Sequence, residues 1–361
     1  MNLKEIAYLR LINQQVARTK FNYPKEIVSW MGAIQAQDYA MAKWAIGLRL
    51  QGSAEKEIEA AFNKGEILRT HLLRPTWHFI SPEDIYWMLE LTAPHIKRSL
   101  NTRRKWLELD RKTMLKSEKI IMVALNEQEH LTRDEIFNFL EIKKIATKNQ
   151  RGVHILLEAE LDGLICSGRI KGNQRTYALL EERVPKKKIL PREEALAELS
   201  QRYFLSHGPA VLQDFAWWSG LPVKDARMAI ESLKKNFISE RIGSQVYWFD
   251  DSISFPDKLI LSAYLLPAYD EFLISYKDRT ASLELEHHKK TVSSNGIFRP
   301  AIVINGKIAG IWKKITKGDE IIIELNLFSL QNKSTVKSLK IRSEELGKFF
   351  EMDTRLLIEK K

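Results

Sequence analysis

The spacing of hydrophobic residues predicts a unit that recurs along the chain, in which two or three amphipathic helices precede a short β-hairpin. The copy in the middle of the chain shows it most clearly. Thr132 and Glu135 form the pattern of a helix N-cap in which the glutamate reaches back to the capping residue. Apolar residues at helical spacing continue through 153–164, and extended stretches follow at 164–167 and 175–180. This segment therefore predicts helices followed by a hairpin.

The same order of elements is predicted on both sides of the middle copy. Towards the C-terminus, helical spacing in 223–233 leads into a hairpin whose two-residue turn is Gly243-Ser244. Towards the N-terminus, helical faces in 27–34 and 41–48 precede extended stretches in 66–73 and 76–80. Helices followed by a two-stranded wing are typical of winged-helix modules, which read double-stranded DNA. Such modules also serve as protein-binding scaffolds, and that alternative stays open.

The last third of the chain has a different pattern. Asn305-Gly306 between apolar stretches is a strong hairpin signal, Lys317-Gly318 marks another turn, and Ser343 begins a final predicted helix. We therefore predict an α+β fold of three tandem winged-helix units and a C-terminal antiparallel β-barrel-like domain. The predicted boundaries are 1–115 for the first unit with extra helices, 116–188 for the second, 189–255 for the third and 256–361 for the C-terminal domain.

Composition narrows the function classes. The single cysteine, Cys166, excludes an intramolecular disulfide, and we expect a cytoplasmic protein because the N-terminus is polar and no apolar run approaches ~20 residues. Scattered histidines and the lack of a nucleotide-binding loop lead us to expect no metal and no cofactor. The net charge of +11 favours a polyanionic partner, either nucleic acid or an anionic membrane.

Two short segments could carry chemistry. Gln35 and Gln37 flank Ala36 at a predicted helix junction, where two amides would point to one side. Taken alone, this pair is explained more simply by capping and solvation. In the extended stretch that follows, Arg74, Thr76 and His78 alternate and would share one face of a strand.

Several separated strings together make the chain resemble a known family. They are Gln35-Ala36-Gln37-Asp38-Tyr39, Ile67-Leu68-Arg69-Thr70-His71, Arg74-Pro75-Thr76-Trp77-His78, Glu160-Leu161-Asp162-Gly163-Leu164-Ile165, Asp214-Phe215-Ala216-Trp217-Trp218-Ser219-Gly220 and Leu266-Pro267-Ala268-Tyr269-Asp270-Glu271. In this order they resemble the bacterial winged-helix DNA glycosylases of the AlkZ type over nearly the whole chain. The resemblance implies three tandem winged helices, a C-terminal β-barrel and excision of alkylated purines, in some members from interstrand crosslinks.

The resemblance also implies which residues act. The paired-glutamine motif is catalytic in that family, so Gln35 and Gln37 are the expected catalytic residues. A purine alkylated on its ring nitrogen carries a positive charge and leaves as a neutral base, so amides that orient water and stabilise charge could suffice. The expected activity is that of a monofunctional DNA glycosylase in base excision repair. The alternative is a non-catalytic winged-helix DNA-binding protein or transcriptional regulator.

Further residues are expected to support this site. Asp38, Thr76 and His78 are expected near the lesion, although capping of the next helix is the simpler role for Asp38. The expected partner is double-stranded DNA, bound by a monomer associated with the nucleoid. Trp217-Trp218 is expected in the core, and 269–271 in a structural turn. The expected phosphate or minor-groove contacts are Arg69, Arg74, Arg169, Lys171, Asn173 and Arg175.

Overall fold

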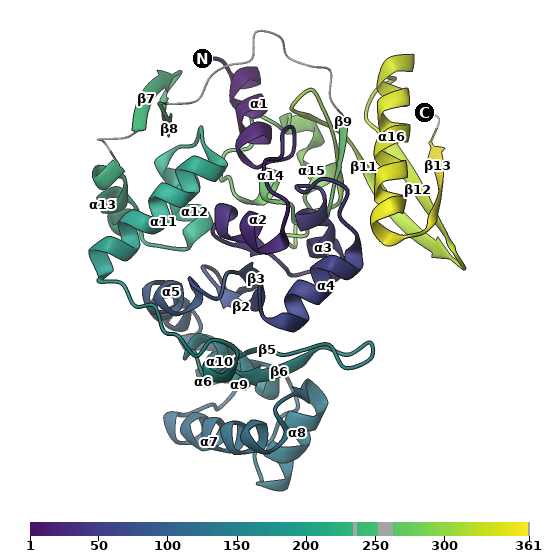
Figure 1. The fold of residues 1–361 in the computed structure, drawn as a ribbon. Helices are drawn as coiled ribbons and strands as arrows, with labels where there is room; N and C mark the ends of the chain where they lie inside the picture. Colours follow the sequence, from purple (N-terminus) through teal and green to yellow (C-terminus); the bar gives the residue numbers. More distant parts are fainter. Residues whose placement is uncertain (234–236, 252–262, 360–361) are drawn as a thin grey trace.

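The computed structural model describes residues 1–233, 237–251 and 263–359, and an order of helix, strand, helix, helix and hairpin recurs within them (Figure 1). The first set is α2 (Pro24–Met31), β1 (Ile34–Gln35), α3 (Tyr39–Gly47), α4 (Glu55–Lys64), β2 (Leu68–Leu72) and β3 (Thr76–Ile80). The second is α7 (Arg111–Gln128), β4 (Leu131–Thr132), α8 (Arg133–Ile142), α9 (Arg151–Leu161), β5 (Ile165–Ser167) and β6 (Thr176–Leu179). The third is α11 (Arg192–His207), α12 (Leu212–Ser219), α13 (Val223–Leu233), β7 (Phe237–Ile242) and β8 (Gln245–Asp250).

The sheets of these sets share one topology. Their strand orders are β1-β3-β2 and β4-β6-β5, so the last strand of each set lies in the middle. In the third set Ala210 pairs with Trp248 of β8, in the place that a first strand would take. The predicted capping box is confirmed, since Thr132 accepts from the Glu135 N–H while the Glu135 carboxylate accepts from the Thr132 N–H. The predicted recurrence of helices followed by a hairpin is therefore confirmed at the level of secondary structure.

The C-terminal segment forms a curled half-barrel sheet of order β13-β12-β11-β10-β9. Its elements are β9 (Ala263–Leu266), β10 (Ala301–Ile304), β11 (Lys307–Lys317), β12 (Glu320–Leu327), α16 (Lys333–Phe350) and β13 (Asp353–Ile358). The turn at Asn305-Gly306 is confirmed, and both residues have the positive φ, 52° and 82°, that a type I′ turn requires.

Two expectations for this segment are wrong. The final helix begins at Lys333, ten positions before Ser343, because Asn332 caps it by accepting from the Thr335 N–H. The sheet is also not purely antiparallel, since β13 pairs with β12 in parallel. A parallel strand needs a crossover, and α16 provides it. The change of pattern placed near Pro256 lies outside the described residues.

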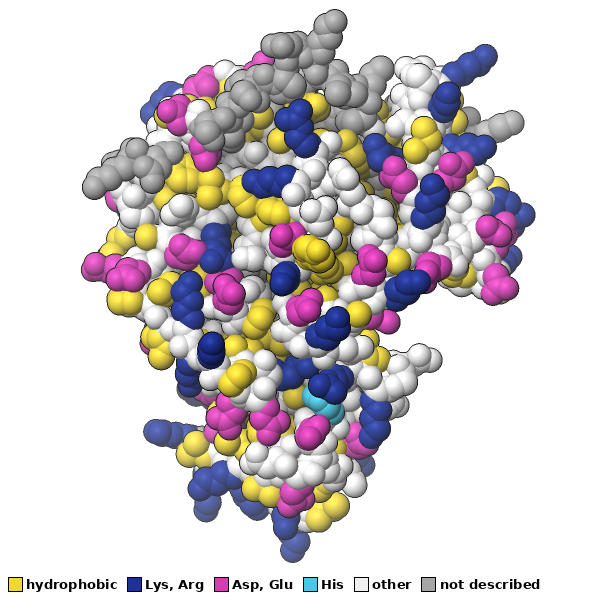
Figure 2. Space-filling model, viewed as in Figure 1, with side chains coloured by type: hydrophobic (Ala, Val, Ile, Leu, Met, Phe, Trp, Pro, Cys, Tyr) yellow, Lys and Arg dark blue, Asp and Glu magenta, His cyan; other side chains and the backbone are white. Residues whose placement is uncertain are grey.

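The remaining elements surround these sheets. They are α1 (Leu3–Asn13), α5 (Ile85–Ser99), α6 (Asn101–Trp106), α10 (Leu180–Arg183), α14 (Glu271–Ile274), η1 (Leu285–His287) and α15 (His288–Thr291). In Figure 1, α7 and α8 form a lobe at the bottom of the view, while α16 and the C-terminal sheet lie at the right edge. Figure 2 shows the outline indented between these two parts, with Lys, Arg, Asp and Glu interspersed on the visible face.

The hydrophobic cores cross the boundaries between sets. One core cluster joins Phe62 and Phe79 of the first set to Leu265 and Trp312 of the C-terminal sheet and to Phe349 of α16. Another joins β2 and α5 to α11, α12 and α13. The first set is therefore packed on both sides, and the C-terminal sheet shares its core.

A buried ion pair links the first set to the C-terminal segment. Arg49 and Asp270 are 0% and 1% exposed, and the guanidinium donates to both carboxylate oxygens at 2.8 and 2.9 Å. Arg49 also donates to the Gln14 backbone oxygen at 2.9 Å. A two-pronged pair of this kind fixes orientation as well as distance.

We predict that Arg49→Met lowers the free energy of unfolding by about 3–5 kcal/mol, because it leaves the Asp270 carboxylate buried without its cation. Urea unfolding measures the change. Arg355→Met is the matched control, since Arg355 and Glu320 form an exposed pair at 3.4 Å, and its loss should cost less than about 1 kcal/mol. Equal effects of the two substitutions would contradict the role given to Arg49.

Candidate active site

The paired-glutamine segment begins as a very short strand. Gln35 is the last residue of β1 and lies opposite His78 on β3, and the Ala36 N–H donates to the Trp77 carbonyl at 2.7 Å. Gln35 is only 4% exposed, whereas Gln37 is exposed. The structure thus places one amide of the pair inside the protein and the other at the surface.

The Gln35 side chain is held by a half-buried cation. Arg74 Nη2 donates to Gln35 Oε1 at 3.0 Å, and the Arg74 guanidinium carbon lies 5.5 Å from the centre of the Trp217 ring. Burial lowers the pKa of Arg74, although nearby Glu271 opposes this effect. A fixed donor on the amide oxygen determines which way the Gln35 NH₂ group points.

The Gln35 backbone is held by a buried carboxylate that the sequence analysis did not single out. The Gln35 N–H donates to Glu271 Oε1 at 2.6 Å, and Trp218 Nε1 and the Ser275 hydroxyl donate to Glu271 Oε2. His207 Nε2 lies 3.6 Å from the same oxygen. Burial opposes ionisation of Glu271, but His207, Ser275 and the Gln35 N–H outweigh it and lower the pKa of the carboxyl to about 2.

The string containing Glu271 explains its position. Tyr269 has a positive φ of 58°, and Asp270 caps α14 by accepting from the Phe272 N–H while it binds Arg49. The expected turn at 269–271 is therefore present, but it also supplies two buried carboxylates. Its recurrence in the resembling family was the signal that could have identified Glu271.

Thr76 and His78 lie on the same strand as expected, at different depths. His78 is completely buried, and its Nδ1–H donates to the Thr76 carbonyl at 2.9 Å. Burial, reinforced by the charge of Arg74, lowers the pKa of His78 to about 3, so the ring is neutral near pH 7. Thr76 is half-buried, and its hydroxyl has no hydrogen-bond partner in the described part of the chain. His78 therefore lies beside Gln35 on the neighbouring strand and does not reach solvent.

Asp38 is exposed at the start of α3. Its carboxylate accepts from the Met41 N–H at 3.1 Å and caps the helix. The simpler of the two roles expected for Asp38 is therefore the one that the structure shows.

Arg69 is buried and close to the motif. It is 4% exposed, its Nε donates to the Ala36 carbonyl at 3.0 Å, and its guanidinium carbon lies 4.4 Å from the Trp77 ring centre. Burial lowers the pKa of Arg69 to about 10, with the neighbouring Arg175 adding to the effect. In this structure Arg69 holds the peptide between the two glutamines.

The remaining expected DNA contacts lie on the wing between β5 and β6. The residues that share this exposed loop are Arg169, Lys171, Asn173 and Arg175. The loop extends back to the first set (Figure 1), where the Ile170 N–H donates to Asn63 Oδ1 at 2.9 Å. The Arg175 guanidinium carbon lies 5.9 Å from the centre of the Tyr39 ring. The wing therefore lies near the N-terminal end of α3, which is also the end that the two glutamines precede.

The two neighbouring tryptophans differ in environment. Trp218 is completely buried, as expected, and donates to Glu271. Trp217 is 40% exposed, so its expected place in the core is wrong. Its indole N–H is nevertheless fixed by the Ile274 carbonyl at 2.8 Å. Consecutive residues of a helix point in different directions, and only one of these two faces the core.

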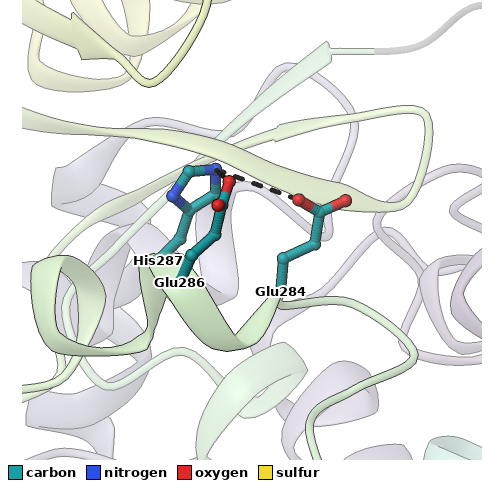
Figure 3. A group of neighbouring side chains, drawn as sticks. All are labelled: Glu284, Glu286 and His287. Atoms are coloured by element: carbon teal, nitrogen blue, oxygen red, sulfur yellow. Dashed lines mark ion pairs between the residues drawn. The ribbon is translucent and has the colours of Figure 1, made fainter.

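A separate polar group lies at η1, with Glu284 as the residue that precedes it (Figure 3). Glu284, Glu286 and His287 offer ligand atoms within 4.8 Å of one another, and His287 Nε2 is 3.2 Å from Glu286 and 4.0 Å from Glu284. Both carboxylates are exposed, and the imidazole packs on Phe328 with ring centres 4.3 Å apart. Surface ion pairing accounts for this arrangement. Across the described ranges, no helix is long and apolar enough to cross a membrane.

Comparison with known proteins assigns the chain to a family. The sequence model described as DNA glycosylase AlkZ-like matches residues 28–349, which is most of the chain and includes both glutamines and Glu271.

The chain belongs to the AlkZ-like DNA glycosylase family.

A curated relative and a solved structure agree with this assignment. The interstrand DNA cross-link repair glycosylase of Streptomyces sahachiroi is 18% identical over 324 residues, covering 80% of this chain and 81% of the relative. The structure of Streptomyces sahachiroi DNA glycosylase AlkZ superposes with a TM-score of 0.82 at 17% identity, covering 99% of this chain and 100% of the other, which shows a shared fold. The protein is thus a DNA glycosylase of the AlkZ-like family that acts in DNA repair, and the regulator alternative is set aside.

We predict that Glu271 makes this AlkZ-like protein sensitive to acid. Its pKa is about 2 in the folded chain against a usual value of 4.5, so the unfolded chain takes up the proton more readily as the pH falls. The stability it contributes is fully present above about pH 4.5 and is lost towards pH 2. The loss should reach about 3 kcal/mol.

Urea unfolding at a series of pH values tests this with Glu271→Gln, which keeps an acceptor for the Gln35 N–H but cannot titrate. The difference in unfolding free energy between wild type and variant should shrink as the pH falls. Glu181→Gln, at an exposed position on α10, should leave the pH profile unchanged. A difference between wild type and Glu271→Gln that stays constant with pH would refute the role of the ionised carboxylate.

Proposed function

We propose that this AlkZ-like glycosylase hydrolyses the N-glycosidic bond of cationic alkylated purines in double-stranded DNA, as a monofunctional enzyme. The observation that carries the proposal is an exposed amide, Gln37, next to a buried amide, Gln35, that Arg74 and Glu271 hold in place. The relative from Streptomyces sahachiroi is named for repair of interstrand crosslinks. We extend the proposal to crosslinks formed through an alkylated purine.

The chemistry suits a site of amides. Glycosidic cleavage passes through an oxocarbenium-like state, and most glycosidases use two carboxylates, one of which protonates the leaving group. A ring-alkylated purine already carries the positive charge that such protonation would supply. The enzyme then has to position water and stabilise charge on the sugar, which oriented dipoles can do. Undamaged bases lack that charge and would leave slowly from the same site.

We assign the two glutamines complementary parts. Gln37 is at the surface and would contact the attacking water. Gln35 would fix the position of residues 35–37 and would also contact that water. Thr76, His78 and Arg69 would act as positioning residues, since His78 and Arg69 are buried. Arg74, with its guanidinium on Gln35, would orient the amide rather than bind a phosphate.

We propose that the recurring sets are three winged-helix units at 1–115, 116–188 and 189–255, followed by a C-terminal domain at 256–361. The order of elements and the shared sheet topology support three units. The expected boundary at 115/116 falls inside α7, so the second unit begins at Arg111. The boundary between 255 and 256 lies outside the described residues. A monomer would bind the duplex at the indentation of Figure 2, which lies between the second unit and the C-terminal sheet, at the nucleoid in the cytoplasm.

We predict that Gln35→Ala and Gln37→Ala each slow single-turnover excision of 7-methylguanine from a duplex by ~10²-fold or more, because each removes about 3 kcal/mol of transition-state stabilisation. Gln128→Ala, at an exposed position on α7, is the matched control and should excise at the wild-type rate. If wild type excises the base and both glutamine variants do so at the same rate, the catalytic assignment of the two amides is wrong.

We predict that the wing carries part of the salt dependence of DNA binding. Replacing Arg169, Lys171 and Arg175 with alanine should reduce the slope of log K against log salt concentration by about 0.9 for each residue that contacts a phosphate. Fluorescence anisotropy with an undamaged duplex measures the slope. Lys340→Ala, at an exposed position on α16, is the control. An unchanged slope in the triple variant would remove the wing from the DNA interface.

A further inference from the structure

A cleft of about 380 Å³ lies beside the β2–β3 hairpin, where the first and second sets meet. Its walls come from the hairpin, from α9 and from the β5–β6 wing. The lining residues used below are Arg69, His71, Trp77, Glu160, Arg175 and Tyr177. The volume lies within the range of pockets that hold small ligands.

Strand register relates this cleft to the paired glutamines. His71 lies directly opposite Trp77 and shares its face of the sheet, while Gln35 lies opposite His78 on the other face. The two faces are joined at Ala36, whose carbonyl accepts from Arg69 and whose N–H donates to the Trp77 carbonyl. Two cleft residues, Arg69 and Trp77, are therefore hydrogen-bonded to Ala36, the residue that precedes Gln37.

The cleft contains a buried hydrogen-bond donor and a buried hydrogen-bond acceptor, each with an atom that makes no hydrogen bond within the described residues. Glu160 is 0% exposed; its Oε2 pairs with His71 Nδ1, while its Oε1 has no hydrogen-bond partner among the residues described. Arg69 is 4% exposed, and its Nη2 likewise lacks a partner there. Buried polar atoms without partners are costly, so a ligand with a donor beside an acceptor would be stabilised here.

The rings in the cleft favour a flat, cationic ligand. The Trp77 and His71 ring centres are 4.3 Å apart, and the Tyr177 ring also lines the cleft. A tryptophan face attracts cations, and the Trp77 ring already has the Arg69 guanidinium carbon 4.4 Å from its centre. The Glu160 carboxylate supplies the opposite charge for a cationic ligand. Arg133 and Arg175 are exposed residues of the lining and carry charge suited to flanking phosphates.

We propose that this cleft binds the alkylated base itself, a guanine-type purine that carries a positive charge and has been turned out of the duplex. The purine N1–H would donate to Glu160 Oε1, its O6 would accept from Arg69 Nη2, and its ring would stack on Trp77. Enzymes that act on a base commonly read its Watson–Crick edge and stack it between rings in this way. The proposal rests on the proposed function, since it gives the same site its specificity for damaged purines.

The test uses the full chain without DNA. Isothermal titration at mildly acidic pH compares 7-methylguanosine with guanosine, which differ in charge on the purine. We expect wild type to bind 7-methylguanosine tighter by on the order of tenfold or more. Glu160→Gln should lose most of that preference, Trp77→Phe should keep part of it, and Trp77→Ala should lose it. Glu181→Gln is the control and should behave as wild type.

The outcomes separate this proposal from the proposed function. Absence of binding by wild type, equal affinity for the two nucleosides, or a preference unchanged in both Glu160→Gln and Trp77→Ala overturns the cleft as the base site, whatever the excision assay shows. A preference that depends on Glu160 or Trp77 supports the cleft even if wild type excises nothing from 7-methylguanine duplexes. If Glu160→Gln fails to fold, as judged by circular dichroism, the Trp77 variants decide.

Discussion

The hydrogen bond from the Gln35 N–H to Glu271 is the contact on which the arrangement of the site depends. A strand of two residues, such as β1, has too few ladder bonds to hold its own register. Glu271 replaces the missing ladder with a charged acceptor 2.6 Å away, and Trp218 and Ser275 hold that carboxylate in turn. Because Asp270 precedes it and binds Arg49, one tight turn supplies both anchors between the C-terminal segment and the first set.

The β2–β3 hairpin then divides the site into two faces with different electrostatics. On one face, Arg74 and the neutral ring of His78 surround the amide of Gln35. On the other, the Glu160 carboxylate and the Trp77 ring lie beside Arg69. Successive side chains of a strand point to opposite faces, and this alternation alone separates the two groups. The Ala36 peptide connects the two faces.

Local signals predicted much of the fold. The capping box at Thr132 and the turn at Asn305-Gly306 depend on residues within a few positions of each other, and both occur as predicted. The start of α16 was missed because Asn332 caps it within a polar stretch that has no apolar periodicity before it. The parallel pairing of β13 was missed because it depends on where a helix returns the chain, which no local pattern encodes.

By itself, the sequence determined most of the helices and hairpins, the capping role of Asp38 and, through the order of its motifs, the family. The catalytic role of the two glutamines stays a prediction. Tertiary structure alone decided that Gln35 is buried and Gln37 exposed, that His78 and Arg69 lie inside, and that Glu271 holds the motif. The physical reason is distance along the chain. Side chains as far apart as Gln35 and Glu271 meet only after the hydrophobic cores have formed, so their burial, partners and pKa values are properties of the packed molecule.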